Sequence, residues 1–169
     1  MRRALACLLV AAVACVACGE DGRERPEQRE IELPPGAPEF GTGRALIDSE
    51  DDSVLLDVEI AQTDEQLAFG LMKREELADD SGMVFLFFEE HRGGFWMKDT
   101  LIPLSIAFFD VDGNIVRIMD MEPCEADPCE VYDPGVGYYG ALEVQRGAFD
   151  EWGVEVGDHI EITQADPTQ

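Results

Sequence analysis

Basic residues are scarce in this sequence. Twelve Lys and Arg stand against 37 Asp and Glu, so the 169-residue chain carries a formal net charge of −25 at pH 7. A surface with this charge repels phosphate backbones and anionic lipid headgroups. The composition therefore argues against nucleic-acid binding and against membrane binding through basic patches. It favours a solvated acidic coat.

Histidine is also rare. The chain has two histidines, His91 and His159, with no metal-ligand spacing between them and no neighbouring nucleophile. No Ser-His-Asp order, nucleotide-binding glycine loop or Cys-His pairing is visible. We therefore predict no zinc site and no cofactor. Paired carboxylates stay open as a catalytic device, because so acidic a chain supplies many of them by chance.

No hydrophobic run is long enough to span a bilayer. Two arginines precede an uncharged apolar run from Ala4 to Val16, which suits the central region of a secretory signal. Small residues then lead to Cys18, after which charge begins at once. This resembles a bacterial lipoprotein signal, so we predict lipidation at Cys18. Cys15 is the alternative lipidation site, and an ordinary signal peptide is the simpler alternative.

The predicted organisation follows from this start. Residues 1–17 would be the signal peptide, 18–42 an acidic, proline-rich tether, and 43–164 the folded domain, followed by a tail at 165–169. We expect an exported protein, periplasmic or extracytoplasmic, that contacts a bacterial membrane through its lipid anchor only.

Short strand patterns dominate the domain. Residues 56–60 alternate apolar and acidic side chains, as a half-buried strand does. Thr63 and Gln66 form a capping-box signature that opens a short helix with Leu67, Ala68, Leu71 and Met72 on one face. A further helical turn is expected at residues 74–77.

Later segments continue the pattern. The apolar run 83–88 predicts a strand buried on both faces, and 102–109 with 115–121 predicts a hairpin about a turn at 110–114. Residues 139–144 and 159–163 predict two more strands, and 147–152 a short helix that Gly153 ends. The fold class is therefore mainly β, a compact sandwich or jelly-roll-like or barrel-like domain with two short helices.

An ordered series of motifs carries a family resemblance. The chain resembles the domain of unknown function 192 family across about residues 43–163. The motifs are Gly70-Leu71-Met72-Lys73-Arg74, Gly82-Met83-Val84-Phe85, Phe95-Trp96-Met97-Lys98-Asp99-Thr100-Leu101-Ile102-Pro103-Leu104, Met121-Glu122-Pro123-Cys124, Ala141-Leu142-Glu143-Val144 and Gly157-Asp158.

The resemblance implies a compact β-sandwich or jelly-roll domain, often with a secretion signal, but no established activity. Two positions depart from the family pattern. The family usually has Asn where this chain has Asp99, and Asp where it has Ser105. If relatives bind a ligand there, its polar contacts differ in this chain.

The segment around Trp96 offers the main candidate for recognition. Strand alternation places Trp96 and Lys98 on one face, and Phe95 and Met97 on the other. Trp96 would stack on a ligand while Lys98 contacts an anion or hydroxyl. Alternatively, Phe95 and Met97 fill the core and Trp96 covers a hydrophobic edge.

Charges within the apolar motifs need an explanation. Arg74, Lys98, Asp99 and Glu143 are expensive to bury unless they are paired. A buried pair of Glu143 with Arg74 or Lys98 is one solution. A ligand-binding cleft that leaves one of the four free is the other.

Cys124 and Cys129 lie in a turn-rich segment of an exported chain, so we predict a local disulfide rather than zinc binding. Met119 and Met121 share a strand face and would allow copper capture, but methionine serves core packing by default. The acidic turn that starts at Asp110 lacks the final Glu of a calcium loop. We predict no metal site.

The sequence thus favours a ligand-binding or interaction module of the cell envelope that uses Trp96, Lys98 and Glu143. Its partner would be a small molecule, glycan or protein, and not nucleic acid. A hydrolase or carbohydrate-active enzyme on the same cleft is the alternative, and a structural envelope protein is the third. A convergent acid–base pair beside a pocket would favour the enzyme.

Overall fold

The computed structural model describes residues 33–49 and 52–165. The predicted signal peptide, Cys18 and most of the tether and tail therefore lie outside the described residues. In chain order the described elements are β1 (Gly41–Asp48), β2 (Ser53–Ala61), α1 (Asp64–Phe69), β3 (Ser81–His91), β4 (Phe95–Trp96), β5 (Leu104–Phe109), β6 (Ile115–Met121), β7 (Val131–Tyr132), β8 (Tyr138–Gln145), α2 (Ala148–Glu151) and β9 (His159–Gln164).

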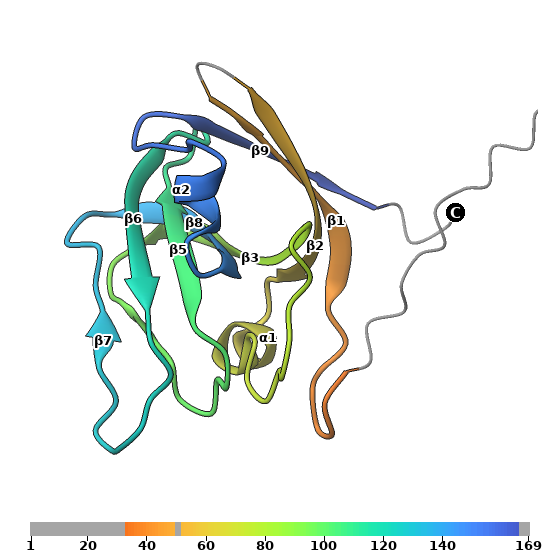
Figure 1. Ribbon diagram of the computed structural model, residues 1–169, viewed down its shortest axis with the longest axis vertical. Helices are drawn as coiled ribbons and strands as arrows, with labels where there is room; N and C mark the ends of the chain where they lie inside the picture. The colour runs from red at the N-terminus through yellow and green to blue at the C-terminus, as the bar shows by residue number, and fades with distance from the viewer. Residues whose placement is uncertain (1–32, 50–51, 166–169) are drawn as a thin grey trace, which may run out of the picture. The chain divides into compact units, whose positions relative to one another are not determined.

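Seven strands form one strongly curved, mixed sheet in the order β6-β5-β8-β3-β2-β1-β9, and β4 pairs with β7 in a second, small sheet. Only β2 and β3 run parallel. Figure 1 shows β5 and β6 facing β1 and β2 across the curl of the sheet. The two edges touch through a bridge between Asn114 and His159. The sheet is not a closed barrel, and the predicted mainly β, sandwich-like class is confirmed.

Alternation along the central strands divides the apolar side chains between two cores. In β8, Ala141 faces one core and Leu142 the other, and in β3 Val84 and Phe85 divide in the same way. The first core is covered by α2 and the strands β1 and β9. The second core is covered by the segments that carry Leu71, Met97 and Tyr132. Both faces of the central strands are therefore buried, as their uniformly apolar sequences require.

The predicted capping box opens α1. The Thr63 side chain accepts a hydrogen bond from the Gln66 backbone, and the Gln66 side chain accepts one from the Thr63 backbone. The helix ends at Phe69, and Ala68 is exposed rather than on the buried face. The helical turn expected at residues 74–77 is wrong. Lys73 adopts a left-handed φ of 63°, which stops helical geometry just before that segment.

The strand predicted at residues 83–88 is present as β3, but one end of it is not buried. Phe88 is 93% exposed. The neighbouring strand β2 pairs with β3 only as far as Phe85, and the pairing of β3 with β8 shifts register between Leu86 and His91. The last part of β3 therefore leaves the two-sided core, a result that hydrophobicity alone does not reveal.

The predicted hairpin is confirmed. Strands β5 and β6 pair antiparallel, and the Asp110 carboxylate accepts hydrogen bonds from the backbone and side chain of Asn114. These bonds, led by that from the Asn114 side chain, lower the pKa of Asp110. The predicted strands near β8 and β9 and the short helix α2 are also present, and Gly153 follows α2 at a φ of 67°. Within the described residues, no helix is long and apolar enough to cross a membrane.

Candidate functional site

Two segments that carry the family resemblance meet at one corner of the domain. We call residues 70–74 and 95–100 together the motif corner. The Lys73 backbone N–H donates to the Asp99 carbonyl oxygen at 2.7 Å and ties the two segments together. Lys73 and Asp99 are also the two described non-glycine residues with positive φ, at 63° and 53°. Conformations of this kind persist only where the surroundings enforce them, and they concentrate at functional sites.

The left-handed backbone explains the first departure from the family pattern. Asn and Asp are the non-glycine residues that adopt this conformation most readily. Asp99 therefore replaces the usual Asn without a backbone penalty. Its side chain is exposed. The first role of position 99 is therefore to adopt the left-handed backbone conformation, and contact with a ligand would be a second role.

The alternation expected around Trp96 is present. Met97 is 2% exposed, whereas Trp96 is 50% exposed, and Phe95 packs partly buried against the second core. The Lys98 ammonium lies 5.3 Å from the centre of the Trp96 ring, within cation–π range. Trp96 and Lys98 thus share the outer face, and the core is filled by their neighbours.

Both lysines of the chain belong to this corner. Lys73 and Lys98 are the only two lysines in the whole sequence. The hydrogen bond between Lys73 and Asp99 places both lysines at the meeting point of the two segments. In a chain of net charge −25, two adjacent lysine positions beside an exposed tryptophan form a local exception to the acidic surface.

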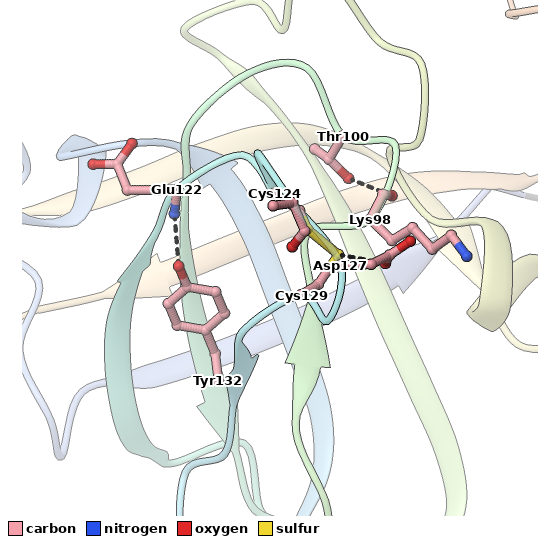
Figure 2. Close-up of a disulfide and its surroundings, with 8 residues drawn as sticks. Lys98, Thr100, Glu122, Cys124, Asp127, Cys129 and Tyr132 are labelled. Atoms are coloured by element: carbon pink, nitrogen blue, oxygen red, sulfur yellow. Dashed lines mark hydrogen bonds between the residues drawn. A yellow bond between two sulfur atoms is a disulfide. The ribbon is translucent and has the colours of Figure 1, made fainter.

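A disulfide-closed loop borders the motif corner. We call residues 122–130, between β6 and β7, the disulfide loop. The expected disulfide joins Cys124 and Cys129, and Figure 2 shows it beside Lys98. The Cys124 N–H donates to the Met97 carbonyl at 3.3 Å. The Glu122 N–H donates to the Tyr132 hydroxyl at 3.0 Å and so joins the two ends of the loop (Figure 2). The disulfide loop is therefore tied to the backbone next to Trp96 and Lys98.

An exposed apolar side chain lies beside Trp96. Val131 faces it across the β4–β7 ladder and is 58% exposed. The sequence alone did not indicate Val131, because a single Val between Glu130 and Tyr132 has no distinctive pattern. The β4–β7 pairing joins residues 35 positions apart, and this pairing creates the patch.

Arg74 is buried, but its partner is not the one considered from the sequence. Its guanidinium lies 2.5 Å from the Glu59 carboxylate, and both side chains are 7% exposed. Glu59 belongs to β2, so the pair clamps the loop after α1 onto the sheet. The Arg74 Nε is the one buried side-chain nitrogen or oxygen in the described residues that lacks a hydrogen-bond partner. The pairing of Arg74 with Glu143 is therefore wrong.

Glu143 lies in β8 and is 5% exposed. Among the described residues no hydrogen bond or ion pair joins its side chain to Arg74 or Lys98, so the pairing of Lys98 with Glu143 is wrong as well. Its register partners are Met83 and Ile106, two buried apolar residues. Burial raises the pKa of Glu143 to about 8, so this carboxyl group is largely protonated at neutral pH.

Ser105 accounts for the second departure from the family pattern. Its buried hydroxyl donates to the Asp120 carboxylate at 2.5 Å and accepts from the Gly147 N–H at 2.8 Å. Asp120 sits directly across the β5–β6 ladder. A neighbouring strand thus supplies a carboxylate beside position 105, and Ser105 joins it to the start of α2.

Two cavities bear on the site. One of about 150 Å³ is lined by Met97, Tyr132 and residues of the disulfide loop. The other, of about 560 Å³, opens between β3 and β9. Neither is lined by Glu59 or Glu143, so these two buried carboxyl groups do not form an acid–base pair beside either cavity. In the same part of the chain, no three His, Cys, Asp or Glu side chains cluster as metal ligands.

The curved sheet, the disulfide loop and the motif corner define an uncharacterised class of small β-rich domains. A family profile described as uncharacterized ACR, COG1430, the domain of unknown function 192, matches residues 46–162. This is well over half of the chain, and the protein belongs to the domain of unknown function 192 family. A comparison with curated proteins finds no match.

Two solved structures are similar to the chain. A Sinorhizobium meliloti protein, described as a candidate transcription regulator, is 30% identical with a TM-score of 0.70. The match covers 75% of this chain and 98% of that protein. A Novosphingobium aromaticivorans protein of unknown function is 29% identical with a TM-score of 0.64, and the match covers 71% and 84%.

Proposed function

We propose that this protein is a binding module of the cell envelope, held on a membrane through lipidated Cys18, and that its motif corner binds acidic glycans. The observation that carries the proposal is the half-exposed Trp96 with the ammonium of Lys98 at 5.3 Å. A rigid indole face stacks on the C–H face of a sugar ring, and adjacent ammonium groups bind its carboxylates and hydroxyls.

The corner is preorganised for such a role. The hydrogen bond from Lys73 to Asp99 and the bond from Cys124 to Met97 hold the backbone on both sides of Lys98. A binding surface that is fixed before the ligand arrives loses little conformational entropy on binding. The exposed side chain of Val131, opposite Trp96 in the β4–β7 ladder, widens the apolar platform beyond the indole.

Charge supports the choice of ligand class. Lys73 and Lys98 attract an anionic ligand locally, while the formal net charge of −25 opposes a long polyanion such as DNA. The Sinorhizobium meliloti protein is described as a candidate transcription regulator. For this chain we propose no nucleic-acid partner, because the formal net charge of −25 opposes a long duplex more than a short acidic oligosaccharide.

The experiment is calorimetric titration of the full chain with two oligosaccharide probes, a hexamer of galacturonic acid and a hexamer of N-acetylglucosamine. We expect the acidic hexamer to bind more tightly, and its binding to weaken with added salt. Lys98→Gln should lower the affinity for the acidic probe about tenfold, as the loss of a charge-assisted hydrogen bond does. Arg117→Gln is the matched control, since Arg117 is an exposed cation on β6, away from the motif corner.

Equal binding of the two probes, or equal losses in Lys98→Gln and Arg117→Gln, would rule out the lysines as recognition groups. Binding of neither probe would remove the glycan proposal. Thermal unfolding of each variant distinguishes a binding defect from a folding defect, because a recognition residue at the surface leaves the melting temperature nearly unchanged.

A further inference from the structure

The larger cavity lies apart from the motif corner. Its volume is about 560 Å³, within the usual range for small-molecule sites. Eight of its fourteen lining residues are aliphatic or aromatic, and it contains no Lys or Arg. The apolar residues are Leu86, Phe87, Phe88, Phe109, Val111, Tyr139, Ile160 and Ile162, and the others are Gln62, Asp110, Asp112, Gly113, His159 and Glu161.

The topology of the sheet explains why a cavity forms here. Strand β2 ends at Ala61, whereas β3 continues to His91, so β3 lacks a partner on that side beyond Phe85. On the opposite side, the β5–β6 turn is held against β9 by the bond from the Ile160 N–H to the Gly113 carbonyl. The space between these segments opens onto the first core, to which Phe109 and Ile160 belong.

Aromatic surface is left exposed at this opening. Phe88 is 93% exposed and Val111 is 68% exposed. Phe88 is released by the register shift between Leu86 and His91, and such irregularities re-aim side chains next to binding sites. A phenylalanine exposed to this degree makes almost no contribution to the core, so core packing does not explain it.

The polar groups of the cavity are mainly acidic. Asp112 and Glu161 are exposed at the opening, and neither forms an ion pair within the described residues. Asp110 is held by hydrogen bonds from Asn114 and stays ionised. Carboxylates beside aromatic faces bind cations, because the negative charge and the ring quadrupole act in the same direction.

We propose that this cavity binds a small amphiphilic cation, with its apolar body against Phe88 and Tyr139 and its ammonium group between Asp112 and Glu161. An anionic ligand would meet three carboxylates and no lysine or arginine in the lining. The cavity is thus complementary in charge to the motif corner, whose lysines attract anions, and the two sites take different ligands.

The test uses three probes that share a phenyl ring and differ in the head group, namely phenethylamine, phenethyl alcohol and phenylacetate. Each is titrated into the full chain and followed by NMR chemical shifts. We expect phenethylamine to bind at least about threefold more tightly than the alcohol, and phenylacetate to bind most weakly. The Asp112→Asn, Glu161→Gln double variant should bring the amine down to the affinity of the alcohol.

Phe88→Ser should lower the affinity for every probe that binds. Val131→Ser, at an exposed apolar residue beside the motif corner, should leave all the affinities unchanged. Both positions are exposed, so both variants should fold. Tightest binding of phenylacetate, or unchanged binding in Phe88→Ser, would overturn the proposal. Failure of all three probes to bind would overturn the proposal as well. If sedimentation then shows a dimer that the Phe88→Ser variant dissociates, this face belongs to a contact with a second copy of the chain.

Discussion

At the scale of single residues, Glu143 and Arg74 show two ways in which this chain buries charge. Arg74 is paired, because the Glu59 carboxylate lies 2.5 Å from its guanidinium. Glu143 has no such partner among the described residues, and desolvation raises its pKa to about 8. From the sequence, a buried pair was one of two solutions for these charges and a ligand-binding cleft was the other, and Glu59 was not considered as a partner. That partner depends on how the loop after α1 folds back over β2.

The raised pKa makes a prediction about stability. A carboxyl group whose folded pKa is about 8, against an ordinary value of 4.5, holds its proton more tightly in the folded state. Its contribution is fully present below pH 4.5 and is lost as the pH rises towards 8. Urea unfolding of Glu143→Gln should therefore show a flatter pH dependence over this window, by roughly 3–5 kcal/mol.

Exposed Glu125 provides the control, because Glu125→Gln removes the same charge without removing a buried group. Parallel pH profiles for Glu143→Gln and the unmodified protein would contradict the protonated, buried state of Glu143.

At the scale of the elements, local patterns predicted what local physics determines. Alternation located β2, the Thr63–Gln66 capping box located α1, and the acidic turn located the β5–β6 hairpin. The misses arise where distant segments decide the outcome. Phe88 is exposed because β2 ends early, and Lys73 leaves helical geometry because its N–H is taken by Asp99.

The motif corner, too, could be predicted from the sequence only in part. The outward pair Trp96 and Lys98 follows from strand alternation and could be predicted. The adjacent positions of Lys73 and Lys98, and the exposed Val131 beside Trp96, could not, since they depend on pairings between distant parts of the chain. Hydrophobicity also cannot indicate the cavity beyond β2, because the same apolar residues would suit a closed core.

Close packing between β8 and β5 yields a prediction at this scale. A Cβ atom added at Gly140 would overlap the ring of Phe109, which is only 5% exposed. Gly140→Ala should therefore lower the free energy of unfolding by about 1–3 kcal/mol, as overpacking does. Gly41→Ala is the control, because its Cβ would meet its nearest neighbour at an ordinary 3.5 Å. Equal urea midpoints for the two variants would show that Phe109 does not pack against β8 in this way.

At the scale of the whole molecule, we propose that a tether connects a lipid anchor to the folded domain. Membrane attachment through Cys18 is a prediction from the apolar run and the small residues before the cysteine. Cys18→Ser should move the protein from the detergent phase to the aqueous phase in a phase-partitioning experiment on bacterial cells. The variant Cys15→Ser is the matched control and should keep the protein in the detergent phase. Unchanged partitioning of Cys18→Ser would remove the anchor, and loss in Cys15→Ser alone would transfer it to Cys15.

The two proposals assign surfaces of opposite charge preference to one domain. The motif corner holds the two lysines of the chain, and the cavity beyond β2 is lined by carboxylates and by no Lys or Arg. Under these proposals an anionic and a cationic ligand bind without competition, because the two sites share no residue. Saturation with phenethylamine should accordingly leave glycan affinity unchanged.

We propose Trp96 as the platform of a glycan site, and titration of a Trp96 variant tests that role. The acidic hexamer is titrated into the full chain and into Trp96→Leu, with Val111→Ser as an exposed apolar control at the other site. We expect Trp96→Leu to lose at least about tenfold in affinity, as loss of an aromatic anchor does, while the affinity of Val111→Ser and the melting temperatures of both variants stay unchanged. Undiminished binding by Trp96→Leu would contradict it.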